Sequence, residues 1–167
     1  WSAGAVTVPV YPSSSASQLA WIVEDSGAKI LVTESAEQAA LAADLDVEVL
    51  VLDDGALETL RERGFAVEDQ DLHRRRDGVT IGAPASIVYT SGTTGTSKAV
   101  KCSQGRLARI ASAATDKFGH HRGDVDYCCM PLFHGNAIMA LWAPALANGA
   151  TVCLTPAFSA SRFLPDV

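Results

Sequence analysis

This sequence predicts an α/β fold, with a Rossmann-like layered sheet that is largely parallel and carries helices on both faces. Three observations lead to this expectation. Short apolar runs of strand length alternate along the chain with segments whose apolar residues recur at helical spacing. Such alternation is typical of βαβ units, in which helices cover a parallel sheet. In addition, polar loops directly follow apolar runs, at the strand ends where open α/β sheets bind ligands.

The first part of the chain, residues 1–65, predicts a series of βαβ units. Expected strands lie over 6–10, 28–33 and 47–52, and expected helices over 17–25, 36–43 and 56–63. The first helix illustrates the signal, because Leu19, Ile22 and Val23 follow a serine cap at helical spacing. The following residues, 66–85, become polar and contain the run HRRRD, which predicts a solvated surface connection.

The remaining residues, 86–167, surround two polar loops. Expected strands lie over 86–89, 99–102, 125–130 and 151–154, and expected helices over 104–117 and 137–147. Ser103 would cap the first of these helices, with Leu107 and Ile110 on its inner face. The loops TSGTTGTS at 90–97 and PLFHGN at 131–136 each follow an expected strand. We therefore expect both loops at strand ends, where a ligand would bind.

Length and charge exclude some classes of protein. A chain of 167 residues can bury a core as a single domain. Its formal net charge of −6 would repel nucleic acid and anionic membranes, so any anion site must be local. No uninterrupted apolar run approaches the ~20 residues that span a bilayer. We therefore expect a cytoplasmic protein that has no membrane span and no nucleic-acid partner.

The cysteines and the two ends of the chain add further expectations. The four cysteines lack metal-binding spacing, so we expect reduced, buried thiols at Cys102, Cys128, Cys129 and Cys153. The chain opens on WSAGAVTVPVYP without an initiator methionine, and it closes on SASRFLPDV, where Ser159 or Ser161 would cap a helix. We expect it to be a piece of a longer protein, with the remainder of that polypeptide as its partner.

The stretch TSGTTGTSK at 90–98 indicates a polyphosphate cradle. Gly92 and Gly95 allow the backbone to fold tightly with its N–H groups turned inward, which suits phosphate oxygens. Hydroxyl donors come from Thr90, Ser91, Thr93, Thr94, Thr96 and Ser97. Lys98 adds a positive charge on a flexible stem.

The other interpretation of this stretch is a solvated turn rich in Ser, Thr and Gly. Two observations favour the cradle: no acidic residue interrupts the stretch, and basic residues gather at Lys98, Lys101, Arg106 and Arg109. The stretch is not a Walker A loop, because Ser97 stands where that motif has glycine before lysine. A metal cluster could also be drawn at His120, His121, Asp124 and Asp126, but loops that end helices commonly collect such residues.

The segment YTSGTTGTSKAV resembles the signature loop of the AMP-forming adenylating enzymes, the superfamily of acyl-CoA synthetases, luciferases and peptide synthetase adenylation domains. Two other stretches resemble the acyl-CoA synthetase branch, namely GAVTVPVYPSSSASQLAWIVEDSGAKILVTES and MPLFHGNAIMALWAPALANGATVCL. The resemblance covers nearly the whole chain. It implies part of the large N-terminal ATP- and acyl-binding domain of an acyl-CoA synthetase.

The resemblance also implies a reaction and roles for residues. The loop 90–98 would clamp the β- and γ-phosphates of ATP, Thr90 would help to hold Mg²⁺, and His134 would lie beside the acyl and nucleotide pockets as a positioning residue. A small-molecule carboxylic acid would attack the α-phosphorus to give acyl-AMP and pyrophosphate, and the thiol of coenzyme A would then take the acyl group. Catalysis of this kind depends mainly on positioning and on neutralising phosphate charge.

The chain departs from the family pattern at Ser97, Ala99 and Gln104, where proline, glycine and histidine are common. It also ends before the family's later motifs, so we expect these residues alone to be inactive. The alternative function is a non-catalytic module that binds a nucleotide or an acyl-adenylate.

Overall fold

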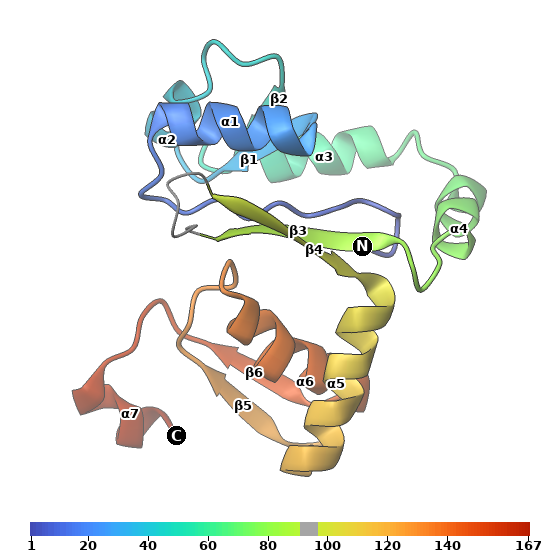
Figure 1. Ribbon diagram of the computed structural model, residues 1–167, viewed down its shortest axis with the longest axis vertical. Coiled ribbons are helices and arrows are strands. Elements are labelled where there is room, and N and C mark those ends of the chain that lie inside the picture. Colours follow the sequence, from blue (N-terminus) through green and yellow to red (C-terminus); the bar gives the residue numbers. More distant parts are fainter. Residues whose placement is uncertain (91–96) are drawn as a thin grey trace. The chain divides into compact units, whose positions relative to one another are not determined.

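The computed structural model describes residues 1–90 and 97–167, and it divides into two compact units. The first unit comprises Trp1–Val79 and Ser86–Val100, and the second comprises Thr80–Ala85 and Lys101–Val167. Each unit combines helices with a small parallel sheet, so the predicted α/β class is confirmed (Figure 1).

The first unit is built on two parallel strands, β1 (Ile30–Thr33) and β2 (Glu48–Val51), with Ile30 opposite Glu48. The helices of this unit are α1 (Ala16–Ser26), α2 (Ala36–Ala40), α3 (Ala56–Gly64) and α4 (Asp69–Asp77). Ser15 caps α1 through a capping box with Gln18, in which each side chain accepts a hydrogen bond from the other residue's backbone N–H. The inner face of α1 buries Leu19 and Ile22 at helical spacing, as the sequence predicts.

A two-stranded sheet joins β3 (Pro84–Thr90) to β4 (Lys98–Ser103), and the division between the units runs through both strands. Within the first unit, an isolated parallel bridge links Thr7 to Ser86. The hydroxyl of Ser86 and the amide of Ile87 both donate to the carbonyl oxygen of Thr7, at 3.0 and 2.9 Å. The amino-terminal segment therefore fixes the beginning of β3.

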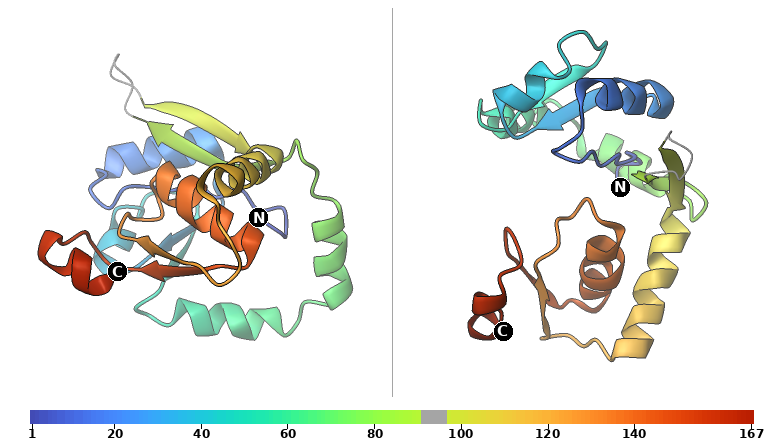
Figure 2. Two further views of the ribbon diagram at one scale, coloured as in Figure 1. Left: turned by 90° about the horizontal axis from the view of Figure 1, so that it is seen from below. Right: turned by 60° about the vertical axis from the view of Figure 1, so that its left-hand side comes forward.

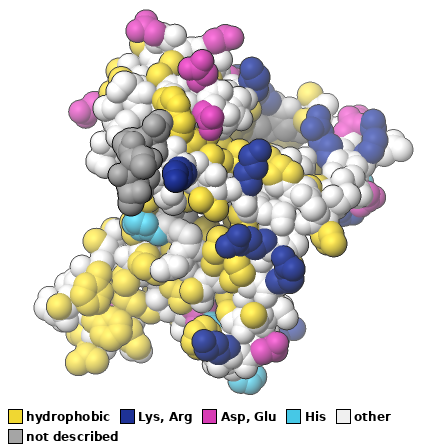
Figure 3. All heavy atoms as spheres, viewed as in Figure 1, with side chains coloured by type: hydrophobic (Ala, Val, Ile, Leu, Met, Phe, Trp, Pro, Cys, Tyr) yellow, Lys and Arg dark blue, Asp and Glu magenta, His cyan; other side chains and the backbone are white. Residues whose placement is uncertain are grey.

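The second unit packs α5 (Gln104–Phe118) against α6 (Ala143–Asn148). Ser103 caps α5 by accepting a hydrogen bond from the amide of Arg106, and Leu107 lies on the buried face, both as predicted. The other elements are the parallel strands β5 (Val125–Cys128) and β6 (Thr151–Leu154), the π-helical turn η1 (Ala137–Trp142) and α7 (Ala160–Asp166). Figure 3 shows hydrophobic side chains gathered over α7 and the segment just before it, where Phe158, Phe163 and Leu164 are exposed.

The structure corrects the prediction of a surface loop after residue 65. Residues 69–77, which include the arginine run, form α4, a helix separate from α3 (Figure 2). Asp69 and Asp71 lie in its first turn and its arginines in the last, an order that the helix dipole favours. Asp71 also pairs with Arg74 one turn later. The segment is still exposed, but it is helical.

Other predictions were wrong in part. The strand expected over 6–10 is reduced to the single bridge at Thr7, because Pro9 has no N–H to donate to a ladder. The helix expected to reach residue 43 ends at Ala40, and the strand expected to reach residue 130 ends at Cys128. All four thiols are free, but only Cys102 and Cys128 are buried, since Cys129 is half-buried and Cys153 is exposed.

Among the helices of the described residues, none combines the length and the apolar content that a bilayer crossing requires.

Candidate functional site

The strands β3 and β4 place the two ends of the TSGTTGTSK stretch side by side. Thr90 is the last residue of β3 and Lys98 is the first residue of β4. The Thr90 hydroxyl lies 3.5 Å from the carbonyl oxygen of Lys98, to which it donates, and both side chains are exposed. Ser97 is half-buried beside them. The other predicted site residues, Ser91, Gly92, Thr93, Thr94, Gly95 and Thr96, lie outside the described residues.

The end of β3 is fixed by a contact that sequence reasoning missed. Tyr89 is only 5% exposed, and its hydroxyl donates a 2.6 Å hydrogen bond to the Asp25 carboxylate in the last turn of α1. The rings of Tyr89 and Trp21 pack edge to face, with their centroids 5.2 Å apart. Hydrogen bonds to charged groups are worth about 1.5–3 kcal/mol, so this contact strongly favours a single arrangement of the two residues.

The same contact perturbs Tyr89 electrostatically. Burial, the hydrogen bond to Asp25 and the negative charge of that carboxylate together raise the pKa of Tyr89 to about 12. The phenol is therefore held in its neutral, hydrogen-bond-donating form. The only sequence signal for this pair was an acidic residue near the end of a helix whose apolar face is buried.

His134 belongs to the second unit, between β5 and η1. Its carbonyl oxygen accepts hydrogen bonds from the amides of Ala137 and Ile138 at 3.0 and 3.4 Å, so His134 stands at the start of a helical segment. The centroid of the His134 ring lies 4.7 Å from the ring centroid of Phe133, and the His134 side chain is exposed. A histidine after an apolar strand is often a buried core residue, but the exposure of the His134 side chain does not fit that role.

The histidines and aspartates after α5 form separate pairs. Nδ1 of His120 lies 3.3 Å from an Asp126 carboxylate oxygen, and Nδ1 of His121 lies 3.7 Å from Asp124. Within residues 1–90 and 97–167, no group of three or more His, Cys, Asp or Glu side chains could hold a metal ion. The metal cluster that could be drawn from the sequence therefore receives no support here.

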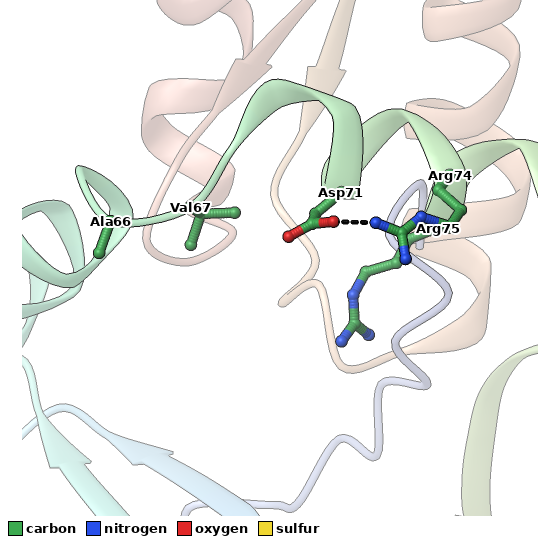
Figure 4. A pocket seen from close by; sticks show the side chains of 5 residues that line it. All are labelled: Ala66, Val67, Asp71, Arg74 and Arg75. Atoms are coloured by element: carbon green, nitrogen blue, oxygen red, sulfur yellow. Dashed lines mark hydrogen bonds and ion pairs between the residues drawn. The ribbon is translucent and has the colours of Figure 1, made fainter.

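Two cavities of the first unit are lined by described residues outside the polar stretch. A depression of about 670 Å³ beside α4 is lined by Ala66, Val67, Asp71, Arg74 and Arg75 (Figure 4). Its Asp71 and Arg74 side chains already pair with each other. A smaller cavity of about 230 Å³ is lined by apolar residues such as Leu19 and Leu31 and by polar ones such as Glu34 and Gln38.

The groups at the described ends of the stretch suit a phosphate ligand. Exposed hydroxyl and ammonium donors match phosphate oxygens, and no carboxylate stands beside them in the sequence from Thr90 to Lys98. The Thr90 hydroxyl is also a hard oxygen of the kind that Mg²⁺ binds, usually together with substrate phosphates.

Comparison with known proteins identifies relatives of the whole chain. The family model described as AMP-binding enzyme matches residues 1–167. Steroid-22-oyl-CoA synthetase of Rhodococcus jostii is 53% identical over 170 aligned residues, which cover 99% of this chain and 30% of that protein. Medium/long-chain-fatty-acid–CoA ligase FadD17 of Mycobacterium marinum is 39% identical over 77% of this chain and 28% of its own length. The chain thus spans less than a third of these relatives.

Solved structures show the same fold. The o-succinylbenzoate CoA synthetase MenE of Bacillus subtilis, bound to its product analogue OSB-NCoA, aligns with a TM-score of 0.78 and 26% identity. The alignment covers 96% of this chain and 31% of that one. MatB of Rhodopseudomonas palustris with bound ATP aligns over 96% of this chain and 32% of its own, with a TM-score of 0.73 and 22% identity.

Proposed function

The chain belongs to the AMP-binding enzyme family, and on this premise we propose that it forms the phosphate-holding part of an ATP-dependent acid–thiol ligase. In the first step, a carboxylate oxygen attacks the α-phosphorus of ATP, and pyrophosphate leaves as acyl-AMP forms. In the second step, the thiol of coenzyme A attacks the acyl carbon, and AMP leaves as the thioester forms. The relatives named as CoA synthetases and CoA ligases support coenzyme A as the acceptor.

The observation that carries this proposal is the meeting of Thr90 and Lys98 at the ends of β3 and β4. Their donors would face the β- and γ-phosphates from both ends of the stretch, and Lys98 would offset the charge of the departing pyrophosphate. The backbone and hydroxyl groups of residues 91–97 would complete the cradle. Mg²⁺, when bound, would neutralise phosphate charge, and Thr90 is the residue of this chain that would contribute an oxygen to it.

His134 would act on the acyl side of the reaction. Its exposed ring next to Phe133 presents an aromatic and polar surface to a ligand. We assign it a positioning role for the acyl group. In this scheme, residues 86–167 form the phosphate-loop half of a larger N-terminal domain, and 1–65 form the supporting βαβ half.

The acid that we propose is a steroid side-chain carboxylic acid. The supporting observation is the 53% identity to steroid-22-oyl-CoA synthetase over almost the whole chain. Medium- and long-chain fatty acids are the second choice, because the FadD17 relative is 39% identical. Both acids are apolar, so they would require a largely hydrophobic acyl pocket.

Carboxylate-dependent exchange of labelled pyrophosphate into ATP tests this function, because adenylation is reversible. The longest reading frame that contains this chain would be assayed with a steroid-22-oic acid, a long-chain fatty acid and no acid. We expect exchange with the steroid acid, slower exchange with the fatty acid, and none without acid. Exchange that does not depend on a carboxylate, or no exchange at all, would refute the proposal.

Residues 1–167 would be assayed separately under the same conditions. We expect no exchange, since relatives that carry out the reaction by name are more than three times as long. Robust exchange by these residues alone would show that the site is complete within them.

A further inference from the structure

The contact between Asp25 and Tyr89 lies directly next to the proposed phosphate-binding end of β3. Tyr89 is joined to Thr90 by a peptide bond, and Thr90 in turn contacts Lys98 through its hydroxyl. The Tyr89 hydroxyl is 2.6 Å from an Asp25 carboxylate oxygen, across 64 residues of sequence. Tyr89 therefore links the last turn of α1 to the exposed donors of Thr90 and Lys98.

The side chains of Tyr89 and Thr90 point to opposite faces, as successive residues of a strand do. Tyr89 is buried against Trp21 of α1, whereas Thr90 is exposed. A rigidly held Tyr89 thus determines where the Thr90 hydroxyl points. The other end of the strand is held at Ser86 and Ile87 by the Thr7 carbonyl oxygen.

The location of Asp25 is unfavourable for the helix that carries it. The carboxyl end of a helix has a partial negative charge, which disfavours a carboxylate in the last turn. α1 ends at Ser26, and Gly27 caps it with a φ of 66° and a hydrogen bond from its amide to the Val23 carbonyl oxygen, without help from Asp25. Asp25 therefore contributes through Tyr89 rather than through helix capping.

From these contacts we infer that Asp25 and Tyr89 are positioning residues for ATP, which hold Thr90 and Lys98 where they can meet the phosphates. The inference rests on the proposed function. Because Tyr89 is joined to Thr90, we expect the pair to affect the binding of ATP and not the binding of the carboxylic acid. The competing explanation is that Asp25 merely satisfies a buried hydroxyl and stabilises the first unit.

The test compares Tyr89→Phe with Tyr127→Phe in the protein that the full reading frame encodes. Tyr127 offers a matched control, since its hydroxyl donates to Asp166 at 3.5 Å and its ring lies edge-on to Phe163 at 5.6 Å. It belongs to the second unit and to no part of the proposed site. Each variant removes one tyrosine hydroxyl that is paired with an aspartate.

We expect Tyr89→Phe to raise the KM for ATP in pyrophosphate exchange by about 3- to 10-fold, which is less than the full cost of the lost hydrogen bond, because the pair acts on ATP only through Thr90. The KM for the carboxylic acid should stay unchanged, and Tyr127→Phe should alter neither constant. Asp25→Asn retains an oxygen that can accept from Tyr89, so it should recover most of the ATP affinity that Asp25→Leu loses. Lower thermal stability with a wild-type KM for ATP in Tyr89→Phe and Asp25→Leu would overturn the inference.

Amide hydrogen exchange of the ligand-free protein separates this inference from the proposed function. We expect Tyr89→Phe to accelerate exchange at the amides of Thr90 and Lys98, and Tyr127→Phe to leave them unchanged. If wild-type protein shows no pyrophosphate exchange but this acceleration occurs, the positioning of Thr90 stands and the ligase function fails. Unchanged amide exchange in Tyr89→Phe would overturn the positioning role whatever the enzyme catalyses.

Discussion

The amide of Gly105 donates a 2.8 Å hydrogen bond to the carbonyl oxygen of Ile81, and this contact leaves no room for a side chain at residue 105. A Cβ atom there would lie 2.9 Å from that oxygen and 3.2 Å from the Cβ of Ile81. The glycine allows the segment before β3 to approach the first turn of α5. The requirement is one of space, because Gly105 lies inside a regular helix.

Gly105→Ala should therefore destabilise the protein by about 1–3 kcal/mol, the usual cost of overpacking against backbone. Urea denaturation would measure the free energy of unfolding. The control is Gly64→Ala at the end of α3, where a Cβ would meet nothing within 4 Å. That variant should be neutral or more stable by up to ~1 kcal/mol, since alanine favours helix. Equal stability of the two variants would contradict the packing argument.

His134→Ala should change the choice of acid rather than the fold. The side chain is exposed, so we expect a loss of less than about 0.5 kcal/mol in stability. Pyrophosphate exchange with a steroid acid and with a fatty acid, normalised to folded enzyme, would give the selectivity. His121→Ala is the control, because His121 is another exposed histidine of the same unit. Lower stability of His134→Ala with unchanged selectivity would make His134 a structural residue.

Local signals in the sequence predicted much of this fold. The cap at Ser103 and the helical spacing that buries Leu107 act within a few residues, so they are readable from the sequence. The signal in the stretch from Thr90 to Lys98 is equally local. The two ends of this stretch meet, as they must when the next strand runs back beside the first. The Asp25–Tyr89 bond was not predictable, because it joins residues that only the tertiary fold brings together.

The polar run in α4 shows a different limit. Its low hydrophobicity suggested a loop, since no apolar stripe marks a buried face. The helix is stabilised by its charges instead, with Asp71 paired to Arg74 and basic residues in the last turn. A pattern based on apolar spacing cannot detect a helix that buries no residue.

The raised pKa of Tyr89 predicts a loss of stability at high pH. A phenol whose pKa rises on folding, from 10.0 to about 12, binds its proton more tightly in the folded state. This contribution is fully present below pH 10 and is lost as the pH rises toward 12, by about 2–3 kcal/mol in total. Urea denaturation between pH 9 and 12 should show that the free energy of unfolding declines less steeply with pH for Tyr89→Phe than for wild type. Parallel curves for the two proteins would contradict the assigned burial and hydrogen bond.

Removing Lys98 should slow adenylation without unfolding the protein. A charge-assisted hydrogen bond is worth about 1.5–3 kcal/mol, so Lys98→Ala should reduce the rate of pyrophosphate exchange about 10- to 150-fold if this ammonium group stabilises the departing pyrophosphate. Stability should hardly change, because the Lys98 side chain is exposed. Arg74→Ala is the control for removing a positive charge, since Arg74 pairs with Asp71 on the exposed helix α4. Wild-type exchange by a folded Lys98→Ala protein would mean that this stretch is a surface turn and that the phosphates bind elsewhere.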